Sequence, residues 1–266
     1  TGSLNTYGTC SSTDASGIST CTLASTKAES KVLSIATPVV KAGSTVVFDP
    51  DGPVAANSSI SGTSPVVADG VTTSTVTITL KDANNNAVPG IIPTFSATDT
   101  GSTNSYGTCS STNASGISTC TLSATKAESK TLSIATPVVK AGGTVVFSAG
   151  SAVAANSTIT GTGPVVADNV ATSTVTVTLQ DANNNPVIGT VPTFSATDTG
   201  TNNTYGVCSS TDSSGVSTCT LASTKAESKV LSIATPVVKA GTTVVFTAGS
   251  AVAGNSSITG TTPVVA

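Results

Sequence analysis

The chain has 266 residues, of which only 9% are charged, and its 10 basic and 13 acidic side chains give a net charge of -3. Nucleic-acid binding needs clustered cations, and single strands also need aromatic platforms, so this composition argues against a nucleic acid as partner. No apolar run approaches the roughly 20 residues that span a bilayer, and no signal peptide is present, so we expect no membrane segment in this sequence. His is absent, which removes nucleophilic catalysis with a histidine base. We therefore expect no enzyme, with no catalytic residue, no metal ion and no cofactor.

A repeat of 99 residues runs through the chain. Cys10, Cys109 and Cys208 share this spacing, and residues 55–153 differ from 154–252 at only 23 of 99 positions. A unit of this size is large enough to bury its own core, so we expect separate domains and not a continuous solenoid. Four segments are predicted: the C-terminal part of a repeat (1–54), two whole repeats (55–153 and 154–252), and the first strand of a further repeat (253–266).

Both ends of the chain fall inside a repeat. The first residue aligns with Thr100 and the last with Ala167. Core residues of the first segment, such as Leu33 and Phe48, then lack the strands that would cover them, and unpaired strand edges aggregate. We expect that neither end is a natural terminus, and that the parent chain continues or a neighbouring molecule supplies the missing strands.

The predicted strands can be followed along the first whole repeat. Pro65, like Pro164 and Pro263, falls in the first strand and confines it to a sheet edge, because proline cannot donate to a ladder. The next strand, 74–80, alternates Val, Ile and Leu with Thr, which predicts one core face and one solvent face. The same alternation recurs in 91–97, in Leu132 with Ile134, and in Val145 with Phe147. About seven short strands per repeat indicate an all-β Ig-like sandwich.

A turn of acidic and amide residues follows the alternating strand. The spacing of Asp82, Asn84 and Asn86 resembles the start of a calcium loop, but an EF-hand needs Gly and Glu where this chain has Ala87 and Pro93. A solvated turn is the preferred interpretation.

The most informative chemical feature of the sequence is a pair of cysteines in each repeat, separated by ten residues. Folding the segment as a hairpin around 14–17 places Cys10 opposite Cys21, close enough for a disulfide. The alternative is a metal site, which needs four Cys or His ligands, and each repeat offers two Cys and no His. We expect disulfides within each repeat, which imply an oxidising compartment. The predicted pairs are Cys10 with Cys21, Cys109 with Cys120, and Cys208 with Cys219.

Other polar groups have two interpretations each. The segment 126–130 is expected to be a solvated strand edge, with a Lys–Asn isopeptide crosslink as the alternative. The acidic residues lie in turns and form no recognisable glycosidase pair. One Tyr per repeat, adjacent to a Cys, is expected to pack against the disulfide and not to form a sugar platform. The acidic residues are Asp69, Asp82, Asp99 and Glu128, and the tyrosines are Tyr7, Tyr106 and Tyr205. Sequons for N-glycosylation begin at Asn57, Asn156, Asn202 and Asn255, so glycosylation is an open alternative.

These segments together resemble the bacterial Ig-like domain of group 1, the module of the intimin and invasin adhesins. The resemblance is carried by 66–70, 75–80, 82–90 and 93–96, and by 181–189 in the next repeat. The glycine usual in the Asp-Ala-Asn-Gly-Asn turn of the family is Asn85 or Asn184 here, and Asn tolerates a positive φ, so we expect the turn to form. The resemblance implies a stalk, because most copies of the module separate a binding tip from the cell.

The predicted function is a structural stalk or fibre segment of a bacterial surface adhesin. One alternative is a subunit of a self-associating extracellular filament or sheath, and another is that the repeats themselves bind a host receptor or glycan. The expected partners are neighbouring repeats of the same chain and other copies in a fibre, and the expected location is extracellular, at the bacterial cell surface.

Overall fold

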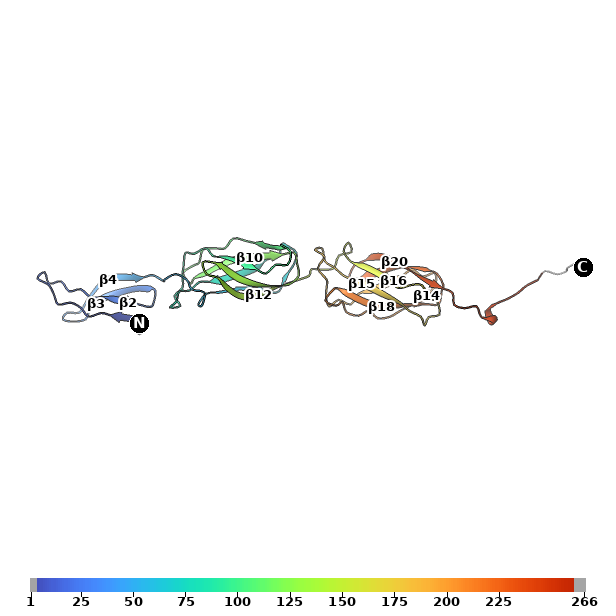
Figure 1. The fold of residues 1–266 in the computed structure, drawn as a ribbon, viewed down its shortest axis with the longest axis horizontal. Helices are drawn as coiled ribbons and strands as arrows, with labels where there is room; N and C mark the ends of the chain where they lie inside the picture. Colours follow the sequence, from blue (N-terminus) through green and yellow to red (C-terminus); the bar gives the residue numbers. More distant parts are fainter. Residues whose placement is uncertain (1–3, 261–266) are drawn as a thin grey trace, which may run out of the picture. The chain divides into compact units, whose positions relative to one another are not determined.

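The computed structural model describes residues 4–260 and divides into two compact units, Thr1–Ser148 and Ala149–Ala266. Regular structure in the described part is strand throughout, apart from one turn of 3-10 helix, so the predicted all-β fold is confirmed. Each unit holds one complete sandwich of two four-stranded sheets. The sandwiches are the green and the yellow-to-orange parts of Figure 1.

The complete sandwich of the first unit contains eight strands. One sheet has the order β5-β7-β10-β9 and the other the order β6-β12-β11-β8. Neighbouring strands are antiparallel except β6 and β12, which are parallel. The strands are β5 (Ser59–Gly62), β6 (Val66–Val67), β7 (Ser74–Thr79), β8 (Thr94–Ala97), β9 (Asn104–Tyr106), β10 (Ile117–Ala124), β11 (Ser129–Thr136) and β12 (Lys140–Ser148).

Alternation in the sequence determines which side chains fill the core. In β7, Val76 and Ile78 have no exposed surface, and the threonines that alternate with them lie on the outer side. Leu132 and Ile134 are likewise fully buried on β11, and Phe147 of β12 is 2% exposed. Facing apolar side chains from both sheets thus form one core, as expected for a half-buried strand pattern.

The predicted first strand is split at Pro65. β5 pairs with β7 in one sheet, and β6 pairs with β12 in the other, so the chain changes sheets at the proline. Both pieces lie at an edge of their sheet, which confirms the expected edge position.

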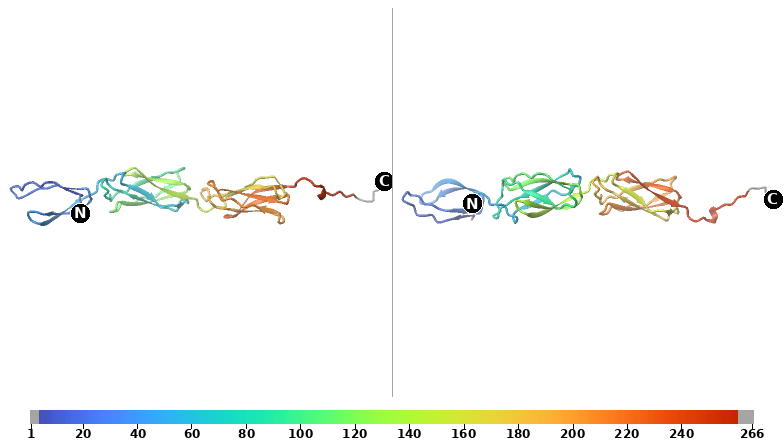
Figure 2. Two further views of the ribbon diagram at one scale, coloured as in Figure 1. Left: turned by 90° about the horizontal axis from the view of Figure 1, so that it is seen from below. Right: turned by 45° about the horizontal axis from the view of Figure 1, so that its top comes forward.

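The second unit repeats this topology, with sheet orders β13-β15-β18-β17 and β14-β20-β19-β16. The two layers are visible from two further directions in Figure 2. The strands are β13 (Thr158–Gly161), β14 (Val165–Val166), β15 (Ser173–Thr178), β16 (Thr193–Ala196), β17 (Asn203–Tyr205), β18 (Val216–Ser223), β19 (Ser228–Thr235) and β20 (Lys239–Thr247).

The segment predicted as a further first strand is described as far as residue 260. That part contains the helix η1 (Ala253–Asn255) and no strand. In the complete repeats the matching strand pairs with β7 or β15, and the described residues after 252 include no such partner. A lone strand has no ladder to stabilise it. Pro263 lies outside the described residues.

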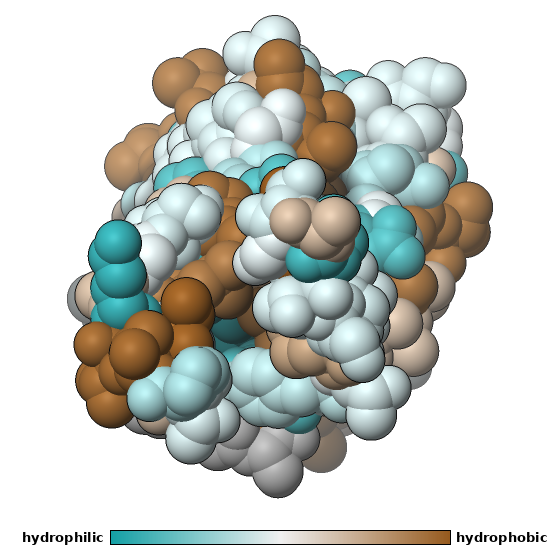
Figure 3. All heavy atoms as spheres, turned by 90° about the vertical axis from the view of Figure 1, so that its left-hand side faces the viewer, coloured by the Kyte–Doolittle hydropathy of each residue, from teal (hydrophilic) through white to brown (hydrophobic). Residues whose placement is uncertain are grey.

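Residues 4–54 form two separate two-stranded sheets, from β1 (Asn5–Tyr7) with β2 (Leu23–Ser25) and from β3 (Glu29–Ile35) with β4 (Lys41–Phe48). Leu33 is 36% exposed and Ile35 50%, whereas the matching residues of β11 are fully buried. A groove of about 950 Å³ lies between the two sheets. In Figure 3 apolar side chains (brown) reach the surface of this end among residues of intermediate hydropathy.

Candidate functional site

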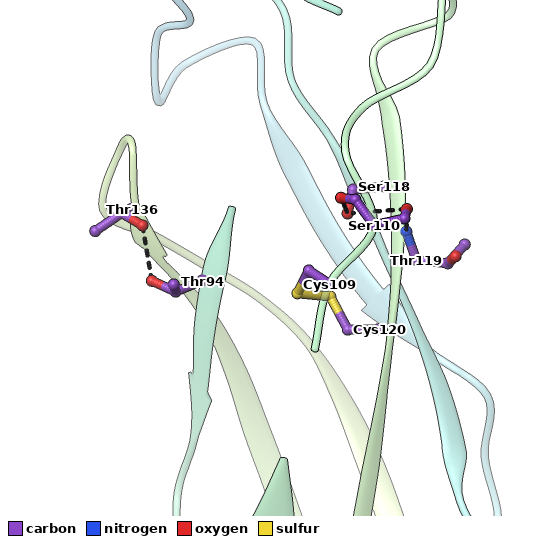
Figure 4. The surroundings of a disulfide bond; sticks show 7 residues. All are labelled: Thr94, Cys109, Ser110, Ser118, Thr119, Cys120 and Thr136. Atoms are coloured by element: carbon purple, nitrogen blue, oxygen red, sulfur yellow. Dashed lines mark hydrogen bonds between the residues drawn. A yellow bond between two sulfur atoms is a disulfide. The ribbon is translucent and has the colours of Figure 1, made fainter. Parts of the chain in front are cut away.

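A tight turn positions the cysteine hairpin of each complete repeat. In the first, the turn 113–116 precedes β10, and the backbone N–H of Ser110 donates to the carbonyl of Thr119 at 2.9 Å. The backbone N–H of Thr119 in turn donates to Ser110 Oγ at 3.0 Å (Figure 4). This register sets Cys109 opposite Cys120, with their Cα atoms 4.2 Å apart, and joins them by a disulfide.

The same bond forms in the other two hairpins. The Cα separations are 4.3 Å for Cys10–Cys21 and 4.2 Å for Cys208–Cys219. In the complete repeats the cysteine on the long strand, Cys120 or Cys219, is 3% exposed and belongs to the core. Each disulfide closes a loop of about a dozen residues, worth about 3 kcal/mol in chain-entropy terms. It ties the segment before the turn to an interior strand.

A buried lysine is the centre of a charged network in each complete repeat. The ammonium of Lys130 lies 2.6 Å from Glu128 Oε1 and 3.3 Å from Asp99 Oδ1, and its side chain has no exposed surface. Lys229 repeats both distances with Glu227 and Asp198 in the second unit. An unpaired charge at a fully buried position would be costly, and these two carboxylates compensate the charge of the lysine.

The network lowers the pKa values of both carboxyl groups. Hydrogen bonds from Lys130 and from the hydroxyl and N–H of Thr100 hold the pKa of Glu128 at about 2. For Asp99, burial acts to raise the pKa, but hydrogen bonds from the Thr103 hydroxyl, a backbone N–H and Lys130 outweigh it and also give about 2. Both groups are therefore ionised at neutral pH.

The prediction of a solvated strand edge over 126–130 was wrong for its last residue. Lys126 is exposed, but Lys130 is buried because β11 lies between β12 and β8 and is an interior strand. Lys130 has the same alternation phase as Leu132 and Ile134, and this phase was the signal in the sequence that a core position was involved. The described partners of its ammonium are two carboxylates and a backbone carbonyl, and no asparagine side chain is among them.

The structure also brings together two carboxylates that sequence reasoning left unpaired. Glu128 and Asp99 meet at one lysine, although they lie 29 positions apart in the chain. Both have low pKa values, whereas a glycosidase acid needs a raised one. The arrangement is that of an ion-pair network.

The turn predicted to be solvated is built on a buried carboxylate. Asp82 is 1% exposed, and its Oδ1 accepts the backbone N–H groups of Asn84 and Asn86 at 2.9 and 2.8 Å. Burial acts to raise the pKa of Asp82, but these bonds and one from the Asn86 amide lower it. Asn84 is exposed as expected, and Asn85 has φ 63°, which confirms that Asn replaces glycine in the turn.

Tyr106 has an aromatic partner that the sequence did not indicate. Its ring packs edge-to-face on Phe95, with centroids 5.2 Å apart and an interplanar angle of 72°. Its hydroxyl bonds to the backbone N and O of Ala97 at 3.2 and 3.3 Å. The tyrosine therefore joins the edge strands β8 and β9 of the two sheets, and Tyr205 with Phe194 does the same in the second unit.

The remaining candidates are held in local structure. Asp69 is a turn residue whose carboxylate accepts from Val71 and Thr72. The amide of Asn57, which begins a sequon, donates to the carbonyl of Asp82 at 2.7 Å, and Asn156 makes the matching bond. Within residues 4–260, no three His, Cys, Asp or Glu side chains lie together as metal ligands would. None of the helical residues described forms a span long and apolar enough to cross a membrane.

Sequence comparison identifies both complete sandwiches. The family model of the bacterial Ig-like domain (group 1) matches residues 57–147 and 156–248, which together are more than half of the chain. This confirms the resemblance drawn from the turn and strand motifs. No curated protein matches the sequence.

Three solved structures have a similar fold. FdeC, an Escherichia coli adhesin, matches with a TM-score of 0.62 and 21% identity, over 92% of this chain and 82% of that chain. InvD of Yersinia pseudotuberculosis matches with a TM-score of 0.57 and 26% identity, over 77% of this chain and 62% of that chain. Invasin, a bacterial integrin-binding protein, matches with a TM-score of 0.58 and 19% identity, over 89% of this chain and 49% of that chain.

Proposed function

Because the chain belongs to the family of bacterial Ig-like domains of group 1, we propose that it is a stalk segment of a bacterial surface adhesin. The stalk holds a distal binding region away from the cell. Support comes from the fold, which this chain shares with FdeC, InvD and invasin. The family is one of Ig-like domains and not of enzymes.

The main support for the proposal is that the two complete sandwiches contain the same internal ion pairs, turns and tyrosine contacts. The lysine ion pairs have the same distances, 2.6 and 3.3 Å, in both units. The turn on a buried Asp and the tyrosine bridge are repeated as well. The length of a spacer increases with every copy, so a stalk benefits directly from repeats that are nearly the same.

The repeats are the units of length. We place their boundaries near residues 54, 153 and 252, in stretches of small residues with few core side chains. The longest strands, β12 and β20, have nine residues each, which corresponds to about 30 Å at ~3.4 Å per residue. With its loops, each repeat adds about 40 Å to the stalk.

Three disulfides support an oxidising compartment, because such bonds persist where thiols are not kept reduced. Together with the low charge, this supports a location outside the cell, at the bacterial surface. The partners of each repeat are its neighbours in the same chain.

A self-associating extracellular filament is the second candidate, and the low content of charged residues, 9%, permits it. In this case purified protein forms regular polymers.

Surface display with a changed repeat number tests the stalk. The chain is displayed on a bacterium with a distal epitope tag, beside a version that lacks residues 55–153, and the tag height is measured by immunogold electron microscopy. The stalk predicts that the deletion lowers the tag by about 40 Å. Equal heights, polymers of the purified chain, or binding of purified repeats to host cells would each contradict it.

A further inference from the structure

A hydrogen-bonded contact joins the first complete repeat to the segment before it. The Asn86 carboxamide accepts the backbone N–H of Ala28 on Oδ1 at 2.9 Å and donates from Nδ2 to the carbonyl of Thr26 at 3.0 Å. The partners are 58 and 60 positions away in the chain. One side chain therefore bonds to both a donor and an acceptor of the same backbone turn. We propose that the turn 82–86 is a latch that fixes the angle between a repeat and the repeat before it.

The latch residue is held in place before it meets its partner. The Asn86 amide donates to Asp82 Oδ2 at 2.7 Å, and its backbone N–H donates to Asp82 Oδ1 at 2.8 Å. The turn also needs the left-handed φ of Asn85. A side chain fixed by its own repeat loses little conformational freedom when it binds the neighbouring backbone.

The linker between the two segments is tied to the same carboxylate. The backbone N–H of Asp51 donates to Asp82 Oδ2 at 3.2 Å. One buried carboxylate thus organises the chain that connects the segments and the side chain that bridges them. The linker and the bridging side chain are therefore both held by the same turn.

The same turn is built in the second unit. Asp181 is 2% exposed and accepts the amide and backbone N–H of Asn185, both at 2.9 Å, and the linker N–H of Gly150 at 2.9 Å. The backbone turn that receives the latch has the sequence Thr-Lys-Ala, which recurs once per period at 26–28, 125–127 and 224–226. Both halves of the latch are therefore encoded in the two complete repeats, and the segment 1–54 carries the receiving half.

The consequence is a stiff junction between the first segment and the first complete repeat. Domains joined by small polar interfaces move relative to each other by default, and a hinge at each junction would make the reach of a stalk variable. The latch would give the proposed stalk its stiffness, so the biological purpose of the latch rests on that proposed function. The latch itself can be tested separately, because the geometry of one junction is measured in solution and without cells.

The test uses two spin labels in the full 266-residue chain. Ser30 of β3 and Thr75 of β7 are exposed strand positions, and a genetically encoded keto amino acid at each takes a nitroxide without touching the cysteines. Electron–electron distance measurements then give the width of the inter-segment distance distribution. Asn86→Ala removes the latch, Ala28→Pro removes the donor of the receiving turn, and Asn84→Ala is the control in the same turn.

The latch predicts a narrow distribution in the parent and in N84A, and a width increased roughly twofold or more in both N86A and A28P. The A28P arm separates the latch from a fold defect, because it leaves every hydrogen bond of Asp82 in place. A broad distribution in the parent, or a narrow one in N86A, would overturn the proposal. Broadening in N86A alone would also overturn it, since the turn would then act only within its own repeat.

Discussion

Replacing Lys130 with Met is expected to destabilise the first complete repeat by about 3 kcal/mol at pH 7. Met has a similar volume and retains the apolar stem, so little hydrophobic burial is lost. The ammonium is removed, and with it the bonds to Glu128 at 2.6 Å and Asp99 at 3.3 Å. The two carboxylates stay, with 19% and 18% of their side chains exposed, and their charge is no longer compensated.

Urea denaturation of the full chain measures this loss. The two complete repeats have the same network, so the substitution separates their transitions and moves one midpoint down by about 2 M, for a slope of about 1.5 kcal/mol per M. Lys229→Met is expected to give the same shift for the second repeat. Lys126→Met, at an exposed lysine in the bend before β11, is the control and is expected to stay within about 0.5 kcal/mol.

The pH dependence separates charge from packing. The pKa of Glu128 is lowered to about 2 in the folded chain from an ordinary value of 4.5, so its contribution is complete above pH 4.5 and disappears as the pH falls towards 2. The difference between the parent and K130M should therefore shrink between pH 5 and pH 2. A loss below about 0.5 kcal/mol at pH 7, or a loss that does not change with pH, would refute the reasoning.

Three further outcomes are expected. Peptide mapping without reduction should recover Cys109 linked to Cys120, and replacing both with Ala should cost about 2–3 kcal/mol in urea denaturation; six free thiols in the unreduced protein would contradict this. Tyr106→Phe should cost about 1 kcal/mol because two hydroxyl bonds to the backbone are lost, and an unchanged midpoint would show that they contribute nothing. Hydrogen exchange at the amide of Leu33, which is 36% exposed, should be faster than at that of the buried Leu132, and equal protection would mean that the first segment closes its own core.

Local pattern was sufficient for much of the fold. The strict alternation around Val76 and Ile78 predicted a strand with one buried face, and both side chains are fully buried. The turn 14–17 predicted a hairpin in which positions 11 and 20 face each other, and the N–H of Ser11 donates to the carbonyl of Thr20 at 2.9 Å. Such features depend on residues close in sequence, where the pleat and the turn determine the geometry.

Local sequence patterns predicted the candidate sites only in part. The cysteine spacing and the positive φ at Asn85 follow from short-range rules, but the burial of Asp82 depends on the linker and strands packed around it. The cluster 126–130 is rich in charged and polar residues, and this composition predicted a solvated edge. The phase alone would have placed Lys130 on the core side, although its two carboxylate partners would still have been unknown.

The 99-residue period, the strands and the hairpin turns can be read from the sequence, because neighbouring residues encode them. Three features emerge only in the folded chain: Lys130 meets both Glu128 and Asp99, the chain changes sheets at Pro65, and Asn86 bonds to Ala28. Most of these contacts join residues tens of positions apart. Their geometry depends on which strands become interior and on how two folded segments meet, and no local pattern specifies either.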